Sequence, residues 1–331
     1  MAPTTSRTPR RCGVLGHPVG HSLSPTLHRA AYAQLGIDDH YTYDLQDVDK
    51  HQIGAVVDQL DASWSGLSLT MPLKQVVIPH LDLLAPTARL THSVNTLVVL
   101  PGGPDLLGGE LDAGPRPAGR PGLLMGANTD VYGIVATVRE SLGDLSLRRG
   151  VIIGGRATAS SALVAMQQLG IGLISVVARS VTGPGNIMEV ADRMDLGLGH
   201  VTFEDHAAIR RLLAGADVVV STVPKGVADQ LVPVVEGLDL SNKVLLDAVY
   251  DPWPTAVAGA WEAHGGKIAP GWVMLLHQAW LQVRLMTGGL QADVDVMRAA
   301  IVAEMARRAA GGAVAPYPEP FDLSAVPPLA G

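Results

Sequence analysis

The chain is poor in aromatic residues and in cysteine. Aromatic residues make up only 4% of the 331 residues, and cysteine occurs once, at Cys12. A single cysteine excludes an intrachain disulfide and argues against a cysteine-based metal site. With so few aromatic rings, the core has to be built from Ala, Val, Leu and Ile, which favours buried parallel strands covered by Ala-rich helices. The length suits one large or two medium domains.

Long apolar runs and long basic runs are also absent. No apolar run reaches 18 residues, so the sequence predicts no transmembrane helix. The basic N-terminus, residues 1–12, lacks the apolar stretch of a signal peptide, and we expect it to be a disordered tail. The formal net charge of −7 makes nucleic acid and anionic membranes poor candidate partners. A reduced, cytoplasmic enzyme is the simplest class.

Strand and helix patterns alternate along the chain. Strands are expected at 12–15, 41–45, 66–70, 97–100, 150–153, 173–178, 216–221 and 243–248. Helices are expected at 24–35, 50–61, from Asp130 onward, and at 157–169, 271–286 and 293–309. This alternation predicts an α/β fold with two units, the second of them Rossmann-like. The Gly- and Pro-rich segment 101–121 is expected to be a mobile hairpin or insertion, and the Pro-rich tail from residue 311 to be disordered.

Three short polar stretches interrupt otherwise apolar sequence. They read GLSLTMPLK at 66–74, SVNT at 93–96 and ANTD at 127–130. Lys74, Asn95 and Asp130 each follow a predicted strand, which is where open α/β sheets collect their ligands. A lysine and a carboxylate that meet in a dry cleft can share a proton. The set therefore suits a small polyhydroxylated ligand and a proton transfer.

The loop before the first predicted helix carries two serines. Ser24 followed by Pro25 is typical of a helix N-cap, and capping is one interpretation of this pair. The other interpretation is an anion site, because the hydroxyls of Ser22 and Ser24 and the free N–H groups there attract a carboxylate. The histidines nearby match no tight metal-ligand spacing, and we interpret them as loop or surface residues: His17, His21 and His28.

A glycine turn, residues 154–159, follows a predicted strand and opens a helix, where a dinucleotide-binding turn belongs. Arg156 occupies the second glycine place, where its guanidinium would either block the pyrophosphate or pair with a phosphate. A bare turn that binds no nucleotide is the third interpretation. The next strand ends in Ala178-Arg179-Ser180 and lacks the acid that NAD-specific units place there. We interpret Arg179 as a residue that binds the 2′-phosphate of NADP, and this interpretation is favoured over the alternative of a solvated surface arginine.

In this order, the motifs resemble those of the shikimate dehydrogenase family. The resemblance covers about residues 13–288, through GHPVGHSLSPTLH at 16–28, the three polar stretches, DVVVSTVPKG at 217–226, DAVYDP at 247–252 and GWVMLLHQAWLQVRLMTG at 271–288. It implies an N-terminal α/β substrate-binding domain (1–129 and 272–310), an NADP-binding Rossmann domain (130–271) and C-terminal helices that return to the first domain. Residues 311–331 remain as a tail, and the active site would lie in the cleft between the domains.

The resemblance also implies roles for individual residues. Lys74 and Asp130 would be the catalytic pair, and no metal is expected. Substrate would be bound by Ser22 and Ser24 through its carboxylate and by Thr70, Asn95, Tyr250 and Gln278. NADP would be bound by Gly154, Gly155, Arg156, Ala157, Arg179 and Ser180. The implied reaction is the reversible, NADP-dependent reduction of 3-dehydroshikimate to shikimate, an oxidation–reduction at CH–OH on the chorismate route to aromatic amino acids.

Departures from the family pattern leave alternatives open. Ser68 stands where an asparagine is common, and Arg156 and Ser160 alter the glycine turn. One alternative is an NAD(P)-dependent quinate/shikimate or aminoshikimate dehydrogenase, and another is a non-catalytic ligand-binding sensor. The presence of both Lys74 and Asp130 argues against the sensor, since binding alone needs no proton-transfer pair. A homodimer is left open because members of the family are not uniform.

Overall fold

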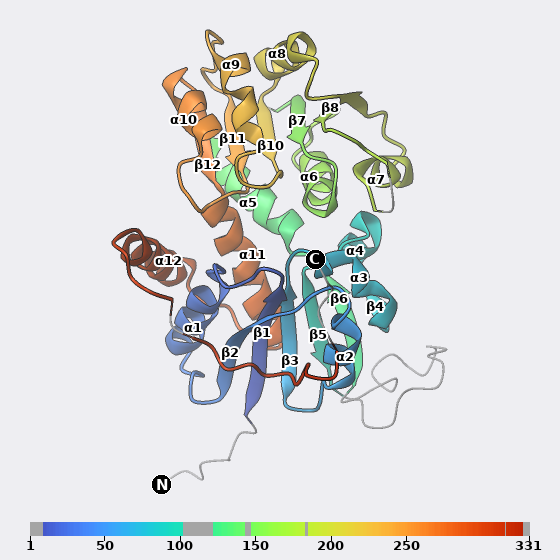
Figure 1. Ribbon diagram of the computed structural model, residues 1–331, viewed down its shortest axis with the longest axis vertical. Coiled ribbons are helices and arrows are strands. Elements are labelled where there is room, and N and C mark those ends of the chain that lie inside the picture. Colours follow the sequence, from blue (N-terminus) through green and yellow to red (C-terminus); the bar gives the residue numbers. More distant parts are fainter. Residues whose placement is uncertain (1–8, 102–121, 143–146, 183–184, 315, 327–331) are drawn as a thin grey trace. The chain divides into compact units, whose positions relative to one another are not determined.

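The computed structural model describes residues 9–101, 122–142, 147–182, 185–314 and 316–326, which form two compact units (Figure 1). Unit 1 comprises Met1–Ala88, Val94–Asn128 and Ala279–Gly331, and unit 2 comprises Arg89–Ser93 and Thr129–Gln278. Within the described ranges each unit has its own six-stranded sheet. The prediction of an α/β fold with two domains is confirmed. The expected N-terminal tail and the insertion lie largely outside the described residues.

The sheet of unit 1 is mixed, with strand order β2-β1-β3-β5-β6-β4. Strand β5 runs antiparallel to β3 and to β6, whereas the other pairs are parallel. The expectation of parallel strands therefore fails at β5, because β5 and β6 are consecutive neighbours and antiparallel neighbours need no crossover helix. The strands are β1 (Arg10–Gly16), β2 (Tyr41–Asp47), β3 (Trp64–Leu69), β4 (Leu83–Leu84), β5 (Thr96–Leu100) and β6 (Leu123–Ala127).

Helices cover both faces of this sheet. On one face Trp64, Leu67 and Leu97 pack with residues of α2 and α3. On the other face Tyr43 of β2 is buried, and so is Tyr32 of α1. Helix α12 packs against α1, and α11 carries the chain from unit 2 into unit 1. The helices are α1 (Ser24–Gln34), α2 (Ile53–Asp58), α3 (Leu73–Val76), α4 (Pro86–Thr91), α11 (Gly271–Met286) and α12 (Val294–Ala309).

The sheet of unit 2 is parallel throughout, with strand order β12-β11-β10-β7-β8-β9. Successive side chains point to opposite faces, so Ile152 and Val220 join the core under α5, α6 and α7, whereas Val151 and Val219 join the core under α8, α9 and α10. This is a doubly wound Rossmann-like arrangement. The strands are β7 (Arg149–Ile153), β8 (Leu173–Val177), β9 (Gly199–Val201), β10 (Val218–Ser221), β11 (Val244–Asp247) and β12 (Lys267–Pro270). The helices are α5 (Asp130–Leu142), α6 (Ala157–Gln168), α7 (Ile187–Arg193), α8 (His206–Gly215), α9 (Val232–Val235) and α10 (Ala256–Ala263).

The C-terminal segment 316–326, which we name the strap, is ordered against unit 1 and corrects the expectation of a disordered tail (Figure 1). The Phe321 ring is 3% exposed and stacks on Trp64 with ring centroids 4.7 Å apart. The side-chain amide of Gln46 donates to the Phe321 carbonyl and accepts from its N–H, both at 2.8 Å. Gln59 makes the same pair of bonds to Asp322. A glutamine amide carries both a donor and an acceptor, so it pairs with a peptide group in a way that composition does not reveal.

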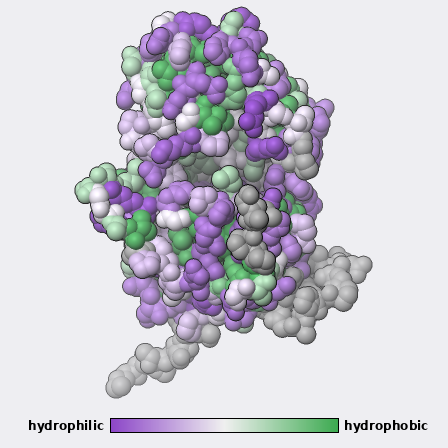
Figure 2. Space-filling model, viewed as in Figure 1, coloured by the Kyte–Doolittle hydropathy of each residue, from purple (hydrophilic) through white to green (hydrophobic). Residues whose placement is uncertain are grey.

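The face of the molecule shown in Figure 2 is largely hydrophilic. On the face shown in Figure 2, hydrophobic residues form small scattered groups among hydrophilic ones. The two most exposed of the large apolar side chains that the structure describes lie in different units, Met71 in the loop after β3 and Leu173 in β8. Within the described ranges, no helix has both the length and the apolar character needed to span a bilayer.

Candidate active site

Three candidate residues of unit 1 lie at one edge of its sheet. Thr70 follows β3 and donates its backbone N–H to Leu15 at the end of β1, 2.9 Å away. Asn95 precedes the antiparallel β5, and its backbone carbonyl accepts from Leu69 at 2.8 Å. Lys74, on α3, accepts a backbone bond from Val94 at 2.7 Å. The structure thus brings Thr70, Lys74 and Asn95 to the same edge, with Lys74 half-buried and Asn95 only 2% exposed.

The serine loop differs from its sequence interpretation in one respect. Helix α1 begins at Ser24 and its cap position is Leu23, with no side-chain capping bond, so the prediction that Ser24 caps the helix is wrong. Instead the Ser22 hydroxyl accepts the Ser24 backbone N–H at 3.2 Å. Proline is tolerated throughout the first helical turn, because the N–H groups there have no intrahelical partner. The position of Pro25 therefore does not determine which residue occupies the cap position. Both serines are buried, and they lie close to each other in the same turn.

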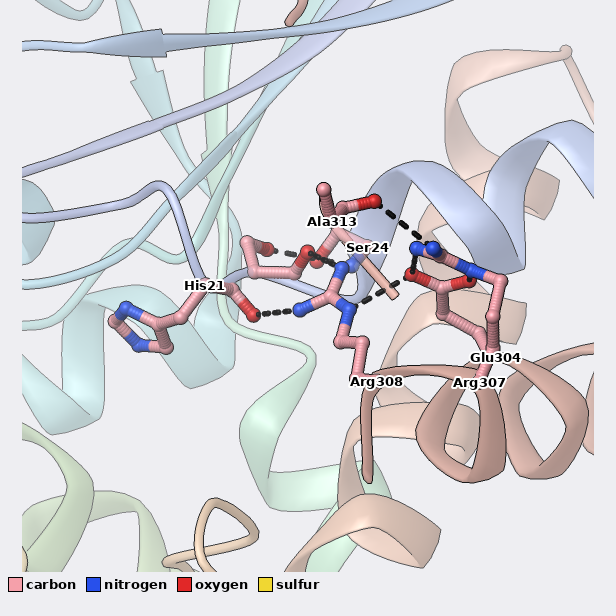
Figure 3. A network of polar contacts seen from close by, with 7 residues as sticks. His21, Ser24, Glu304, Arg307, Arg308 and Ala313 are labelled. Carbon is pink, nitrogen blue, oxygen red and sulfur yellow. Dashed lines mark hydrogen bonds and ion pairs between the residues drawn. The ribbon is translucent and has the colours of Figure 1, made fainter. Parts of the chain in front are cut away.

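The side chain of Arg308 in α12 binds the main chain of this serine loop (Figure 3). Its guanidinium donates to the carbonyls of His21 at 2.7 Å and Ser22 at 3.3 Å. Glu304 accepts from Arg308 at 2.7 Å and from Arg307 at 2.8 Å. These hydrogen bonds lower the pKa of Glu304 to about 2, and the bond with Arg307 has the largest effect. The carboxylate therefore stays charged and keeps Arg308 aimed at the serine loop, a role that the sequence did not reveal.

The remaining candidates belong to unit 2. Asp130 is the first residue of α5, where the helix dipole favours a carboxylate, and it is 4% exposed. Its neighbour Thr129 donates to the side chain of Gln278 on α11 at 3.2 Å. A Cβ added to Gly133 would lie 2.8 Å from the carbonyl of Met274, so glycine lets α5 and α11 approach closely. This packing puts Gln278 beside the start of α5, while Tyr250 follows β11 and is half-buried.

A cavity of about 420 Å³ opens at the carboxyl ends of the strands of unit 2. Gly154 adopts φ +120°, and a Cβ there would lie 2.3 Å from the Thr222 hydroxyl, so the turn needs glycine. Helix α6 starts at Ala157 without a side-chain cap, which leaves its first N–H groups suited to a phosphate. Of the six predicted cofactor residues, five line this cavity: Gly154, Gly155, Arg156, Arg179 and Ser180. The chemistry of this donor set fits a dinucleotide phosphate.

Sequence reasoning missed other residues that line the same cavity, among them Phe203 and Glu204 after β9 and Gln230 beyond β10. They have no motif, because their position depends on how separate loops meet. Arg156 is exposed and stands at the cap position of α6 in extended conformation. Its guanidinium therefore lies on the surface of the turn with Arg179 in the same cavity wall.

A buried polar cluster beneath the unit 1 site was also missed. His28 is fully buried in α1 and stacks on Tyr43 with centroids 3.9 Å apart, so the interpretation of His28 as a loop or surface residue is wrong. Burial lowers the pKa of His28 to about 3, which keeps the imidazole neutral. Gln282 contacts His28 and Ser68 from α11. Gln282 lies one helical turn after Gln278 in a largely apolar helix, and that spacing was the available signal.

Within the described ranges, no group of three or more His, Cys, Asp or Glu side chains is arranged to hold a metal ion. A parallel doubly wound sheet with a glycine turn at a helix N-terminus defines unit 2 as a dinucleotide-binding type of domain. Unit 1 carries a separate set of lysine, asparagine and serine side chains at one sheet edge. Together these features define a two-domain α/β protein of the dehydrogenase class.

Comparisons with known proteins agree with this class. The family profile "Shikimate dehydrogenase substrate binding domain" matches residues 14–97, and "Shikimate 5'-dehydrogenase C-terminal domain" matches residues 271–302. The shikimate dehydrogenase (NADP(+)) of Rubrobacter xylanophilus is 32% identical over 295 residues, which are 88% of this chain and 95% of that protein. The chain belongs to the shikimate dehydrogenase family, as its motifs predicted.

Solved structures show the same relationship. The crystal structure of Mycobacterium tuberculosis shikimate dehydrogenase is 33% identical, with a TM-score of 0.74, and covers 89% of this chain and 100% of its own. A shikimate 5-dehydrogenase from Mycobacterium fortuitum is 35% identical with a TM-score of 0.71, and covers 91% and 99%. Because the matches span both units, the family fold extends over nearly the whole chain.

Proposed function

We propose that this protein catalyses the reversible, NADP-dependent reduction of 3-dehydroshikimate to shikimate. The observation that carries the proposal is the similarity to a relative named shikimate dehydrogenase (NADP(+)), which spans 88% of this chain. The chain also has both Lys74 and Asp130, the pair that its motifs predict to be catalytic. A non-catalytic sensor would not need that pair. We further propose that unit 1 binds substrate and unit 2 binds cofactor, with substrate as the small-molecule partner.

The cofactor would be held by the cavity of unit 2. Gly154 and Gly155 let the backbone approach the pyrophosphate, and the first turn of α6 supplies N–H donors. Arg179 would pair with the 2′-phosphate, which distinguishes NADP from NAD. When bound, NADPH supplies the hydride for the ring carbonyl, and NADP⁺ accepts it in the reverse direction.

The side chains of this chain would do the rest of the chemistry. Ser22 and Ser24 would bind the substrate carboxylate, and Thr70, Asn95, Tyr250 and Gln278 its other oxygen atoms. As the carbonyl is reduced, negative charge develops on its oxygen, and the Lys74 ammonium would stabilise that charge and donate the proton. Asp130 would orient Lys74 and accept a hydrogen bond from the neighbouring hydroxyl. Homodimer formation and a cytoplasmic location stay predictions.

The test is the initial rate with shikimate, scanned against NADP and NAD, with quinate as the rival substrate. We expect rapid turnover with shikimate and NADP. Preference for quinate or NAD would instead favour the alternative of an NAD(P)-dependent quinate/shikimate dehydrogenase. No turnover with any pair of substrate and cofactor would favour a non-catalytic ligand-binding sensor.

Replacing the lysine tests the mechanism. We expect Lys74→Ala to reduce kcat by about two orders of magnitude or more, with a smaller change in substrate binding, because proton donation matters mainly in the transition state. Lys50→Ala, at an exposed lysine of the same unit, is the matched control. Near-normal kcat in Lys74→Ala would contradict the assignment.

A further inference from the structure

A buried chain of hydrogen bonds runs from the core of unit 1 to the side chain of Asn95. Its centre is Gln282 of α11, which is 1% exposed. The Nε2 group of Gln282 lies 3.2 Å from the backbone carbonyl of Asn95 and 3.0 Å from the Thr96 hydroxyl. A backbone carbonyl only accepts, so this end of Gln282 is its NH₂ group and the opposite end is its carbonyl oxygen.

That assignment sets the direction of every other bond. The Oε1 atom of Gln282 must accept, and it lies 2.8 Å from the Ser68 hydroxyl and 3.3 Å from His28 Nε2. Ser68 therefore donates to Gln282 and accepts from the Tyr43 hydroxyl at 2.6 Å. His28 carries its proton on Nε2, which agrees with a neutral ring. Both ends of the Gln282 amide are thus committed to buried partners.

The chain ends at a candidate substrate contact. Thr96 accepts from Gln282, which leaves its single hydroxyl proton to donate, and it donates to Asn95 Oδ1 at 2.8 Å. Because Oδ1 faces Thr96, the Nδ2 group of Asn95 is turned to the other side of the amide. Asn95 would then offer an N–H donor, which is complementary to a hydroxyl or carboxylate oxygen of a hydroxylated acid.

We propose that Gln282 is a positioning residue that acts through Thr96 to fix the Asn95 amide with its NH₂ group toward the substrate. The inference rests on the proposed function, since it assigns Asn95 to substrate binding. A buried glutamine is costly unless both its ends are paired, and here the pairing also sets the orientation of Asn95. The network thereby selects a ligand that accepts at Asn95 over one that donates there.

The experiment is a set of variants assayed for KM and kcat with shikimate and for shikimate binding by calorimetry without cofactor. Thr96→Val removes the hydroxyl while preserving shape, and Thr96→Ser keeps the hydroxyl. We expect Thr96→Val and Gln282→Met to raise KM and Kd about tenfold, with kcat within about threefold of wild type, because a binding bond is lost rather than a transition-state bond. Thr96→Ser should stay within about twofold of wild type.

A double-mutant cycle separates positioning from a general structural effect. In an Asn95→Ala background, Thr96→Val should have no further effect on KM, because both changes remove the same contact. The control is Thr137→Val in α5, where another fully buried threonine hydroxyl bonds to Gly133. If Gln282→Met fails to fold, the pair of Thr96 variants still decides the question.

Two results would overturn the inference while wild type is active: a Thr96→Val enzyme with the KM of wild type, or an undiminished effect of Thr96→Val in the Asn95→Ala background. A wild-type protein that neither turns over nor binds shikimate would instead overturn the proposed function, and this inference with it.

Discussion

The strap offers the most direct test of how the C-terminus stabilises unit 1. Phe321 is 3% exposed and stacks on Trp64, so Phe321→Ala removes a nearly fully buried ring. Burying a phenylalanine side chain is worth about 1.5–3 kcal/mol. In a closed core the substitution costs about 3–5 kcal/mol, but here the cost is limited because the strap can detach.

The limit follows from the contacts of the strap. Gln46 and Gln59 make four hydrogen bonds to its backbone, each worth about 1 kcal/mol net. A detached strap loses these bonds but regains the backbone entropy of its freed residues, and this opposing change limits the cost of detachment. We therefore expect Phe321→Ala to destabilise unit 1 by about 2–3 kcal/mol, and deletion of residues 315–331 to have at least the same effect.

The assay is calorimetric melting, with Glu319→Ala as the control at an exposed residue of the same segment. A loss of this size should lower the melting temperature of unit 1 by about 5–10 °C. If Phe321→Ala and the deletion both melt within about 1 °C of Glu319→Ala, the strap does not stabilise the fold and the reasoning is refuted.

Two further predictions concern pH and the cofactor. The pKa of His28 is about 3 in the folded protein and about 6.5 in the unfolded chain. Below about pH 6 the unfolded state therefore binds a proton that the folded state does not. The free energy of unfolding should fall by up to about 1.4 kcal/mol per pH unit as the pH drops toward 3. His28→Phe should flatten the slope of melting temperature against pH between 6 and 4, and an unchanged slope would rule out His28 as its source. Arg156 lines the cofactor cavity as an exposed cation, so Arg156→Ala should weaken NADP binding about tenfold in calorimetric titration, with Arg148→Ala as control; tighter binding would show that Arg156 obstructs the pyrophosphate.

The local motifs of the sequence predicted the elements that carry the site. Lys74 and Asp130 follow strands as expected, and α11 has the predicted bounds. The same expectation is wrong for Asn95, which precedes β5 and reaches this edge of the sheet because β5 is antiparallel to β3. The helix expected at 24–35 is observed as Ser24–Gln34, and Gly36 follows its C-cap with φ +65°. These features depend on neighbouring residues and on side-chain periodicity, which a sequence displays directly.

Errors arose where a residue's role depends on distant partners. His28, Gln282 and the strap residue Phe321 are each buried by contacts with distant residues, up to 275 positions away along the chain. Burial decides whether a histidine is neutral and whether a Pro-rich tail is ordered, because both depend on removal from water. The sequence by itself determined the two α/β units, the family and the order of the motifs. Only the tertiary structure decided which side chains are buried together, and therefore which way the amide of Asn95 points.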